Sequence, residues 1–253
     1  MARVLLAGES WSTTSVHTKG FDSFITSTYA EGADGFIAAL EAAGHTVDFQ
    51  PNHVAPERFP FTAEALDEYD VVVLSDIGAN TLLLPQAVFL TGQARPNRLA
   101  VLADWVRAGG LLLMVGGYLS FTGIEAKANY RNTPLAHVLP VELELADDRE
   151  ETPEGSVGTL TEAGRVVLPA LHEQWPPILG YQRLTAKVGA TTLATVQGHP
   201  LVVVGTAGAG RTAAVATDMG PHWLSSEFMN WDGFAALWNG VLDVLLSTEE
   251  MSA

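Results

Sequence analysis

The sequence predicts an α/β protein whose mostly parallel sheet is wound with helices and continues into antiparallel strands. Short apolar runs alternate with helical patterns through the first half of the chain, the order that a doubly wound sheet requires. Three strand-like runs then follow one another closely near the C-terminus, which predicts an antiparallel extension. A length of 253 residues and an apolar fraction of 47% allow a sizeable core, and we expect one domain over residues 1–253.

In the first half, apolar runs and glycine stops define the expected elements. Strands are expected at residues 3–7, 46–49, 70–74 and 111–115, and helices at residues 32–43, 66–69 and 98–108. Uninterrupted apolar runs such as 111–115 suit parallel strands that are covered on both faces. Residues 9–28 are polar and too long for an ordinary connector, so we expect a functional or partly helical loop there.

The second half begins with an acidic segment. Residues 141–154 hold seven acidic residues and one arginine, which predicts a solvated excursion, extending to about residue 190. Strands are expected at 191–196, 201–205 and 212–217, separated by glycine-containing turns. A final amphipathic helix begins at about Trp231, and its core face is formed by Leu237, Trp238, Val241, Leu242 and Leu245.

The composition excludes several classes of function. The formal charge of −16 argues against nucleic acid and anionic membranes as partners. The absence of cysteine excludes disulfides, thiolate metal sites and a cysteine nucleophile. No run has the length of a transmembrane span, and the N-terminal run does not match a signal peptide, so we expect a cytoplasmic protein. We expect a small-molecule ligand and no cofactor; a homo-oligomer stays open, because no patch marks an interface.

Ionisable and hydrogen-bonding side chains follow every predicted strand end. In open α/β sheets, ligands bind outside the carboxyl ends of the strands, so these side chains should meet at one edge and form a site. They are Glu9 and Ser10, Asn52 and His53, Asp76 and Asn80, Tyr118 and Ser120, and finally Asp218 with His222 and Trp223 just beyond.

Structural roles are open for the same residues. Asp76 could cap a helix or turn, and Asp218 could close an Asx turn. His17 could belong to an ordinary surface loop, and His53 and His222 could be structural histidines. Imidazoles and carboxylates of this set could also bind a metal ion, but no pair has metal-motif spacing, so we predict no metal ligand.

Residues 112–121, which read LLMVGGYLSF, resemble the strand, nucleophile elbow and helix of the class I glutamine amidotransferase-like superfamily. More closely, the chain resembles the GATase1-like family of glutamine amidotransferase-like proteins, which is similar to the trehalose-utilisation ThuA-like proteins. The matching stretches are residues 8–11, 17–22, 51–54, 75–80, 116–121 and 218–223. This resemblance implies a flavodoxin-like, three-layer α/β/α sandwich.

The glutaminase activity of that superfamily does not carry over to this sequence. Its members use a cysteine nucleophile on the elbow and a His–Glu pair near the C-terminus. Here Tyr118 stands at the nucleophile position and Ser120 at the second glycine, while His222 and Glu227 have the wrong spacing. Un-ionised tyrosine is a poor nucleophile for amides, so we reject glutamine hydrolysis by that route.

The remaining groups suit acid–base or hydrolytic chemistry on a small polar metabolite, and the ThuA-like resemblance implies a carbohydrate derivative. The alternatives are a non-catalytic ligand-binding or scaffold protein and a metal-dependent hydrolase. Tyr118 would donate a hydrogen bond or, with a lowered pKa, transfer protons, and the N–H groups after it would form an oxyanion hole. The predicted catalytic residues are Glu9, His17, Asp76, Tyr118 and Asp218. The predicted substrate-binding residues are Ser10, Trp11, Lys19, Asp22, His53, Asn80, Gly117, His222 and Trp223, with Trp11 and Trp223 as stacking platforms. The enzyme hypothesis requires Glu9, His17, His53, Asp76, Tyr118 and Asp218 to converge.

Overall fold

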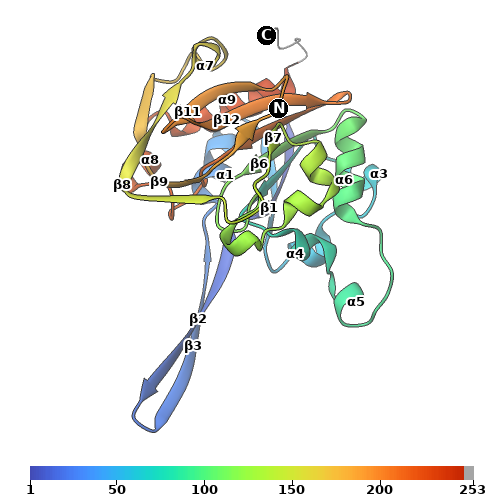
Figure 1. The fold of residues 1–253 in the computed structure, drawn as a ribbon. Helices are drawn as coiled ribbons and strands as arrows, with labels where there is room; N and C mark the ends of the chain where they lie inside the picture. The colour runs from blue at the N-terminus through green and yellow to red at the C-terminus, as the bar shows by residue number, and fades with distance from the viewer. Residues whose placement is uncertain (248–253) are drawn as a thin grey trace.

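A nine-stranded mixed sheet organises the computed structural model, which describes residues 1–247 (Figure 1). The five strands from β4 to β13 run parallel, and β12, β11, β8 and β9 continue the sheet with antiparallel pairing. This confirms a mixed α/β fold with an antiparallel extension. In sheet order the strands are β4 (Thr46–Pro51), β1 (Arg3–Gly8), β5 (Val71–Ser75), β6 (Leu111–Val115), β13 (Gly210–Val215), β12 (His199–Ala207), β11 (Thr191–Val196), β8 (Arg149–Leu160) and β9 (Gln174–Gln182).

The helices form two packed groups. Helix α1 (Asp34–Ala42) contacts α9 (Phe234–Leu246), which buries all five of the core residues predicted for it. Helix α6 (Arg98–Arg107) contacts α3 (Ala63–Leu66) and α4 (Ala79–Leu83). The shorter helices are α2 (Ala55–Arg58), α5 (Gln86–Phe89), α7 (Glu162–Val167) and α8 (Ser226–Met229), with 3-10 turns at Ile124–Ala126, Tyr130–Asn132 and Pro134–His137. No helix within residues 1–247 is long and apolar enough to cross a bilayer.

The loop predicted at residues 9–28 is instead a long β-hairpin. Strands β2 (Ser10–Lys19) and β3 (Asp22–Glu31) pair in register and project from the body (Figure 1). Gly20, with φ of 66°, occupies the first position of the two-residue turn, where a positive φ favours glycine. The prediction of a partly helical loop was therefore wrong, and residues 10–31 are called the hairpin arm below.

The segment predicted as a solvated excursion contributes strands to the main sheet. Residues 149–160 and 174–182 form β8 and β9, and β7 (Val141–Glu142) pairs with β10 (Thr185–Ala186). The carboxylate of buried Asp148 accepts the N–H groups of Thr122 and Gly123 at 3.0 and 2.8 Å. Glu142 and Glu144 are exposed, so the segment is solvated only in part. Arginine partners or backbone donors compensate Asp147, Asp148, Glu150 and Glu151, whereas Glu154 is exposed.

Candidate functional site

Three carboxyl groups meet at the carboxyl edge of the parallel strands. Glu9 directly follows β1, Asp76 directly follows β5, and Asp218 is the third residue after β13. Their exposed fractions are 1%, 9% and 2%. The strands are in parallel register across β1, β5, β6 and β13, so their ends lie at one edge, as the order of elements predicted. Asp76 presents the largest exposed fraction of the three.

Two of these carboxyl groups belong to residues with a strained backbone conformation. Glu9 and Asp76 each leave their strand with positive φ, 45° and 42°, which is uncommon for residues other than glycine. The Glu9 N–H donates to Ser75 O at 2.8 Å, and the Ser75 hydroxyl donates to Glu9 Oε2 at 2.5 Å. Both contacts join the ends of β1 and β5, so the turn that strains Glu9 also directs its carboxyl group inward.

Asp218 forms the Asx turn that was its alternative structural role. Its Oδ1 atom accepts the N–H groups of Met219 and Gly220 at 2.7 and 3.2 Å. Asp76 does not cap a helix, because the N-cap of α4 is Gly78. Asp218 therefore has a local structural role and also belongs to the carboxyl cluster.

Burial raises the pKa of all three carboxyl groups, and the charge of a neighbouring carboxylate adds to this for Glu9 and Asp218. Burial raises the pKa of Glu9 from 4.5 to about 7; the Ser75 hydrogen bond lowers it in part and the Asp76 charge raises it. Burial, followed by the charges of Glu9 and Asp76, raises the pKa of Asp218 well above its ordinary value. Burial also raises the pKa of Asp76, against lowering effects of the Leu119 N–H and His222. At neutral pH, Glu9 therefore lies close to the midpoint of its titration.

The elbow after β6 does not offer a free oxyanion hole. The N–H of Leu119, directly after Tyr118, donates to Asp76 Oδ1 at 2.6 Å, and the N–H of Ser120 donates to Gly117 O at 3.3 Å. Both donors are occupied, so the predicted oxyanion hole is wrong for this conformation. Burial and the nearby Glu151 raise the pKa of Tyr118, so its hydroxyl stays protonated and suits hydrogen-bond donation, not proton abstraction.

Aromatic rings cover the cluster on its solvent side. The His222 ring lies 4.5 Å from Trp11 and 6.1 Å from Tyr118, measured between ring centroids. Tyr118 and His222 are exposed, whereas Trp223 is buried and donates its Nε1–H to Glu151 Oε2 at 3.1 Å. The prediction of Trp223 as a stacking platform is therefore wrong in this conformation, while Trp11 keeps a partly exposed ring.

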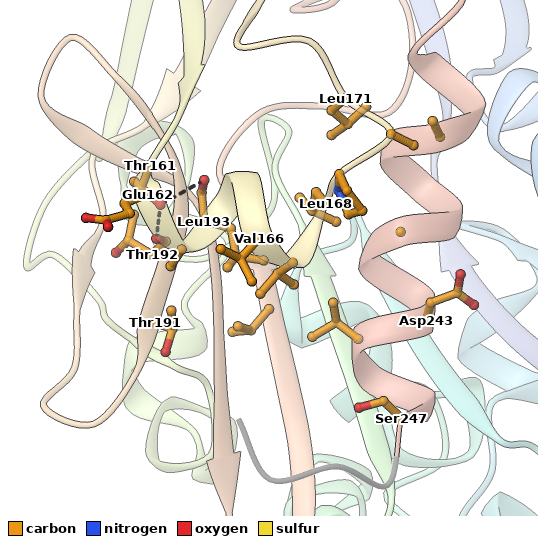
Figure 2. A pocket seen from close by; sticks show the side chains of 18 of the residues that line it. Thr161, Glu162, Val166, Leu168, Leu171, Thr191, Thr192, Leu193, Asp243 and Ser247 are labelled. Carbon is orange, nitrogen blue, oxygen red and sulfur yellow. Dashed lines mark hydrogen bonds between the residues drawn. The ribbon is translucent and has the colours of Figure 1, made fainter. Parts of the chain in front are cut away.

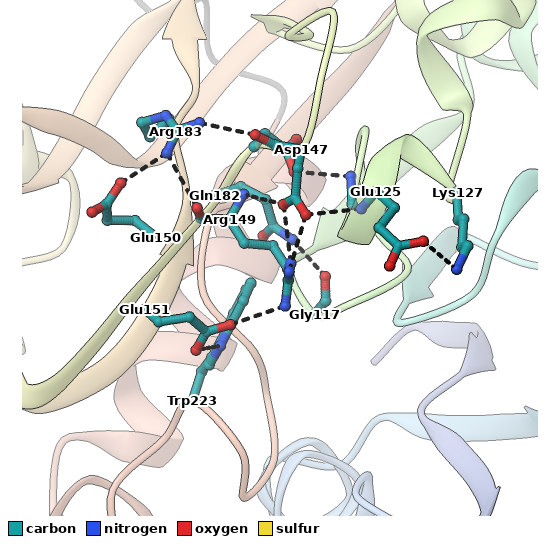
Figure 3. A network of polar contacts seen from close by, with 12 residues as sticks. Gly117, Glu125, Lys127, Asp147, Arg149, Glu150, Glu151, Gln182, Arg183 and Trp223 are labelled. Carbon is teal, nitrogen blue, oxygen red and sulfur yellow. Dashed lines mark hydrogen bonds and ion pairs between the residues drawn. The ribbon is translucent and has the colours of Figure 1, made fainter.

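Three residues beside the elbow were not predicted from the sequence (Figure 3). The Arg149 guanidinium lies 4.8 Å from the centre of the Tyr118 ring and forms an ion pair with Glu151. Gln182 donates its Nε2–H to Gly117 O at 2.5 Å. All three come from β8 and β9, so only the long-range strand pairing places them near the elbow. Their acidic and glutamine-containing segments carry no local signal for this position.

The hairpin arm holds three predicted site residues away from the cluster. His17 is exposed, bonds Thr26 Oγ1 through Nε2 at 3.0 Å and stacks on Phe24 at 4.6 Å. Lys19 and Asp22 flank the turn at the arm tip. At about 3.3 Å per residue, His17 lies roughly 23 Å along the strand from Ser10. The six-residue convergence that the enzyme hypothesis requires is therefore incomplete within one chain.

The other predicted residues lie around the cluster with structural contacts. Ser10 Oγ accepts the Asn52 N–H at 2.8 Å, and the Asn52 side chain donates to Ser10 O and Asp76 O at 2.6 and 3.0 Å. His53 is exposed and packs edge-on against Tyr29 at 5.1 Å. Asn80 is exposed in the first turn of α4. Asn52, which joins the ends of three strands, belongs to the site although it was not selected as a binding residue.

A cavity of about 1150 Å³ lies elsewhere, between α7, β11 and α9 (Figure 2). Apolar side chains such as Val166, Leu168, Leu171 and Leu193 line much of it, and none of the predicted site residues does. We favour the carboxyl edge as the chemical site, because the clustered ionisable groups lie there. Within residues 1–247, no group of three His, Asp or Glu side chains is arranged to hold a metal ion.

The comparison with protein families covers nearly the whole chain. The model of a family described as "Putative glutamine amidotransferase" (GATase1-like) matches residues 3–247. The chain belongs to this family. Among solved structures, it is similar to cytoplasmic protein STM1381 from Salmonella typhimurium LT2, with 47% identity, a TM-score of 0.92, and coverage of 96% of this chain and 99% of that one.

Two further structures place this family member among its neighbours. Cytoplasmic protein STM3548 from Salmonella typhimurium shares 42% identity with a TM-score of 0.92, covering 96% of this chain and 98% of that one. A ThuA-like protein from Parabacteroides merdae shares 12% identity with a TM-score of 0.57, covering 100% and 92%, and so shares the fold alone. No curated protein matches the chain.

Proposed function

We propose that this protein binds a small polar metabolite, of the carbohydrate-derivative class, at the carboxyl edge of the sheet and transforms it by acid–base chemistry. The carboxyl groups would carry this chemistry without His17, whose place on the hairpin arm leaves the six-residue convergence unmet. The observation that carries the proposal is the cluster of Glu9, Asp76 and Asp218, which come from three strand ends and whose pKa values are all raised, chiefly by burial. Strongly perturbed carboxyl groups that gather beneath an accessible surface are typical of functional sites. A purely structural role would not require three like charges in one buried volume.

The three carboxyl groups have different roles in this proposal. Asp76 is the group nearest the surface and would contact the substrate. Glu9, whose pKa is about 7, would take up or release the balancing proton at neutral pH. The Tyr118 hydroxyl would donate a hydrogen bond to a substrate oxygen, and the rings of Trp11 and His222 would pack against an apolar sugar face.

One observation favours a non-catalytic ligand-binding protein as the second candidate. The elbow carries Tyr118 in place of a nucleophile, and Asp76 occupies the Leu119 N–H that would stabilise an oxyanion. A metal-dependent hydrolase has weaker support, because the described residues provide no donor set for a metal. Turnover therefore separates the two remaining candidates, since both predict binding at the same edge.

We also propose the finer assignments that the family resemblance implies. The packing of α1 against α9, and of α6 against α3 and α4, supports a flavodoxin-like layering of helices on the two faces of the sheet. A cytoplasmic location is supported by the cysteine-free composition. The two Salmonella relatives are named cytoplasmic proteins, which agrees with that location.

A thermal-unfolding screen with neutral sugars, sugar acids and polyols tests the proposed function. A ligand present at 100 times its Kd stabilises the native state by about 2.7 kcal/mol, or roughly 5–10 °C for a chain of this size. The variant Asp76→Asn should lose most of this shift or lose turnover, whereas Glu154→Gln, at an exposed position on β8, should respond as the wild type does.

Each outcome of the screen has a distinct meaning. A stabilising compound that NMR shows to be converted, and that Asp76→Asn binds without converting, supports acid–base catalysis. Binding without conversion supports the second candidate. A compound that stabilises Asp76→Asn and the wild type equally, and is converted by both, contradicts the assignment of the site.

A further inference from the structure

The hairpin arm presents apolar side chains on both of its faces. Strand register places Val16 opposite Ile25 on one face and His17 opposite Phe24 on the other. Val16 and Ile25 are 68% and 67% exposed, and Phe21 at the turn is fully exposed. A hairpin that lay against its own domain would keep its apolar groups on one face. Apolar groups on both faces indicate an arm that is enclosed by another surface.

The arm also lacks the support that a two-stranded hairpin needs. An isolated hairpin is marginally stable in water, and both edges of this one have unpaired backbone groups beyond the body (Figure 1). Cross-strand contacts such as Thr14 with Ser27 at 3.2 Å involve exposed polar groups and contribute little. An extended, well-formed arm of ten residues per strand is therefore expected to gain stability from a partner.

Charge favours a second copy of the same chain as that partner. Residues 10–31 carry only Lys19, Asp22 and Glu31 as charged side chains, whereas the whole chain has a charge of −16. Two copies would repel one another over most of their surfaces, since like charges at an interface are unfavourable. The nearly neutral arm is a region through which they can associate.

The size of the arm matches what a stable dimer requires. Ten residues per strand span about 33 Å, and two strands with their side chains are about 10 Å wide. Each face then offers about 300 Å², so two exchanged arms that are enclosed on both faces bury roughly 2,400 Å² when both partners are counted, above the usual 1,200–2,000 Å². Arms that dock through one face bury about 1,200 Å², at the lower end of that range.

We propose that the hairpin arm docks on the site-bearing edge of a second copy of this chain, in a symmetric dimer that exchanges two arms. That edge carries a second exposed apolar surface, Phe89 and Leu90 at α5, which projects from the same end of the molecule as the arm (Figure 1). Helix α5 belongs to the connection that leaves the carboxyl end of β5, so it follows the same edge of the sheet as the cluster. The partner's arm would therefore cover the site and bring its polar tip, with Lys19 and Asp22, toward it.

The test is the oligomeric state of the full chain by sedimentation over a dilution series. The wild type should sediment at about twice the monomer mass of 26.9 kDa. Ile25→Asp should raise the dimer dissociation constant at least about tenfold, and Phe89→Asp should do the same. Val188→Asp, at a fully exposed valine outside the hairpin arm and α5, is the matched control and should stay dimeric.

Folding and geometry are checked separately. Ile25→Val should remain dimeric, and the circular dichroism of Ile25→Asp should match the wild type, because the position lies outside the core. Since the chain has no cysteine, a spin label at Ser23→Cys reports one intermolecular distance in the dimer and none in a monomer. A monomeric wild type, or a dimeric Ile25→Asp, overturns the proposal. An unchanged dimer affinity in Phe89→Asp overturns docking on the site-bearing edge, whatever the result of the ligand screen.

Discussion

Glu9→Gln should remove a pH-dependent loss of stability that is built into the carboxyl cluster. Because the pKa of Glu9 is about 7 in the folded chain and near 4.5 when unfolded, the folded state holds an extra proton between these values. The free energy of unfolding therefore falls as the pH rises from 4.5 through about 7. At about 1.4 kcal/mol per pH unit, the loss approaches about 3 kcal/mol.

The substituted amide keeps the shape of the Glu9 side chain and can still accept the Ser75 hydroxyl, but it does not ionise. In urea unfolding from about pH 4.5 to 8.5, the free energy of unfolding of the variant relative to that of the wild type should therefore rise by about 3 kcal/mol. The raised pKa values of Asp76 and Asp218 act in the same direction. Burial, their largest cause, remains in both proteins, whereas the variant removes the contribution of the Glu9 charge to the pKa of Asp218. Glu154→Gln, at an exposed position, controls for the loss of one surface charge. Parallel pH profiles for Glu9→Gln and the wild type would refute the reasoning.

Three further changes test other parts of the structure. Gly32→Ala would place a methyl group against Glu9 Oε1, so we expect the free energy of unfolding, measured in urea, to fall by about 1–3 kcal/mol. An unchanged free energy of unfolding would show that the Glu9 carboxyl group is free to move. Arg98 is buried and donates to four backbone carbonyls at 2.7–3.3 Å, so Arg98→Met should lower the unfolding temperature by roughly 10 °C. A change within about 2 °C would show that these hydrogen bonds do not stabilise the fold. Burial raises the pKa of Asp148 to about 6, so the free energy of unfolding of the wild type should fall as the pH rises from 3.8 to about 6. Urea unfolding over this pH range should show a smaller fall for Asp148→Asn, and an equal pH dependence in the two proteins would contradict the raised pKa.

Local signals were enough to predict the parallel part of the fold and the positions of the carboxyl groups. Apolar runs such as 71–75 have the length of buried strands, and Gly44, with φ of 87°, ends α1 where predicted. Glu9 and Asp76 were found because the residue after a parallel strand faces the binding edge whatever the helices do. This rule depends on topology alone, so it needs no knowledge of side-chain packing.

Features that depend on long-range pairing were not predictable in the same way. The hairpin arm lacks the apolar–polar alternation of a half-buried strand, because neither face packs on the body. Arg149 reaches Tyr118 only because β8 and β9 extend the sheet. Trp223 is buried because Gly180 on β9 leaves room for its ring, and a side chain there would overlap it. Each of these contacts joins segments that no local pattern connects.

The hydrogen bond from the Leu119 N–H to Asp76 bears on how the chemistry of this elbow could change. Replacing Tyr118 with cysteine would restore a thiol at the nucleophile position, yet the adjacent donor would still be held by a carboxylate. A negative group in that place would repel the oxyanion of an acyl-transfer intermediate. The path from this chain to a thiol-dependent amidase therefore needs at least two substitutions, and the first alone brings no advantage. Such a barrier keeps the lineage on chemistry that uses Asp76 itself.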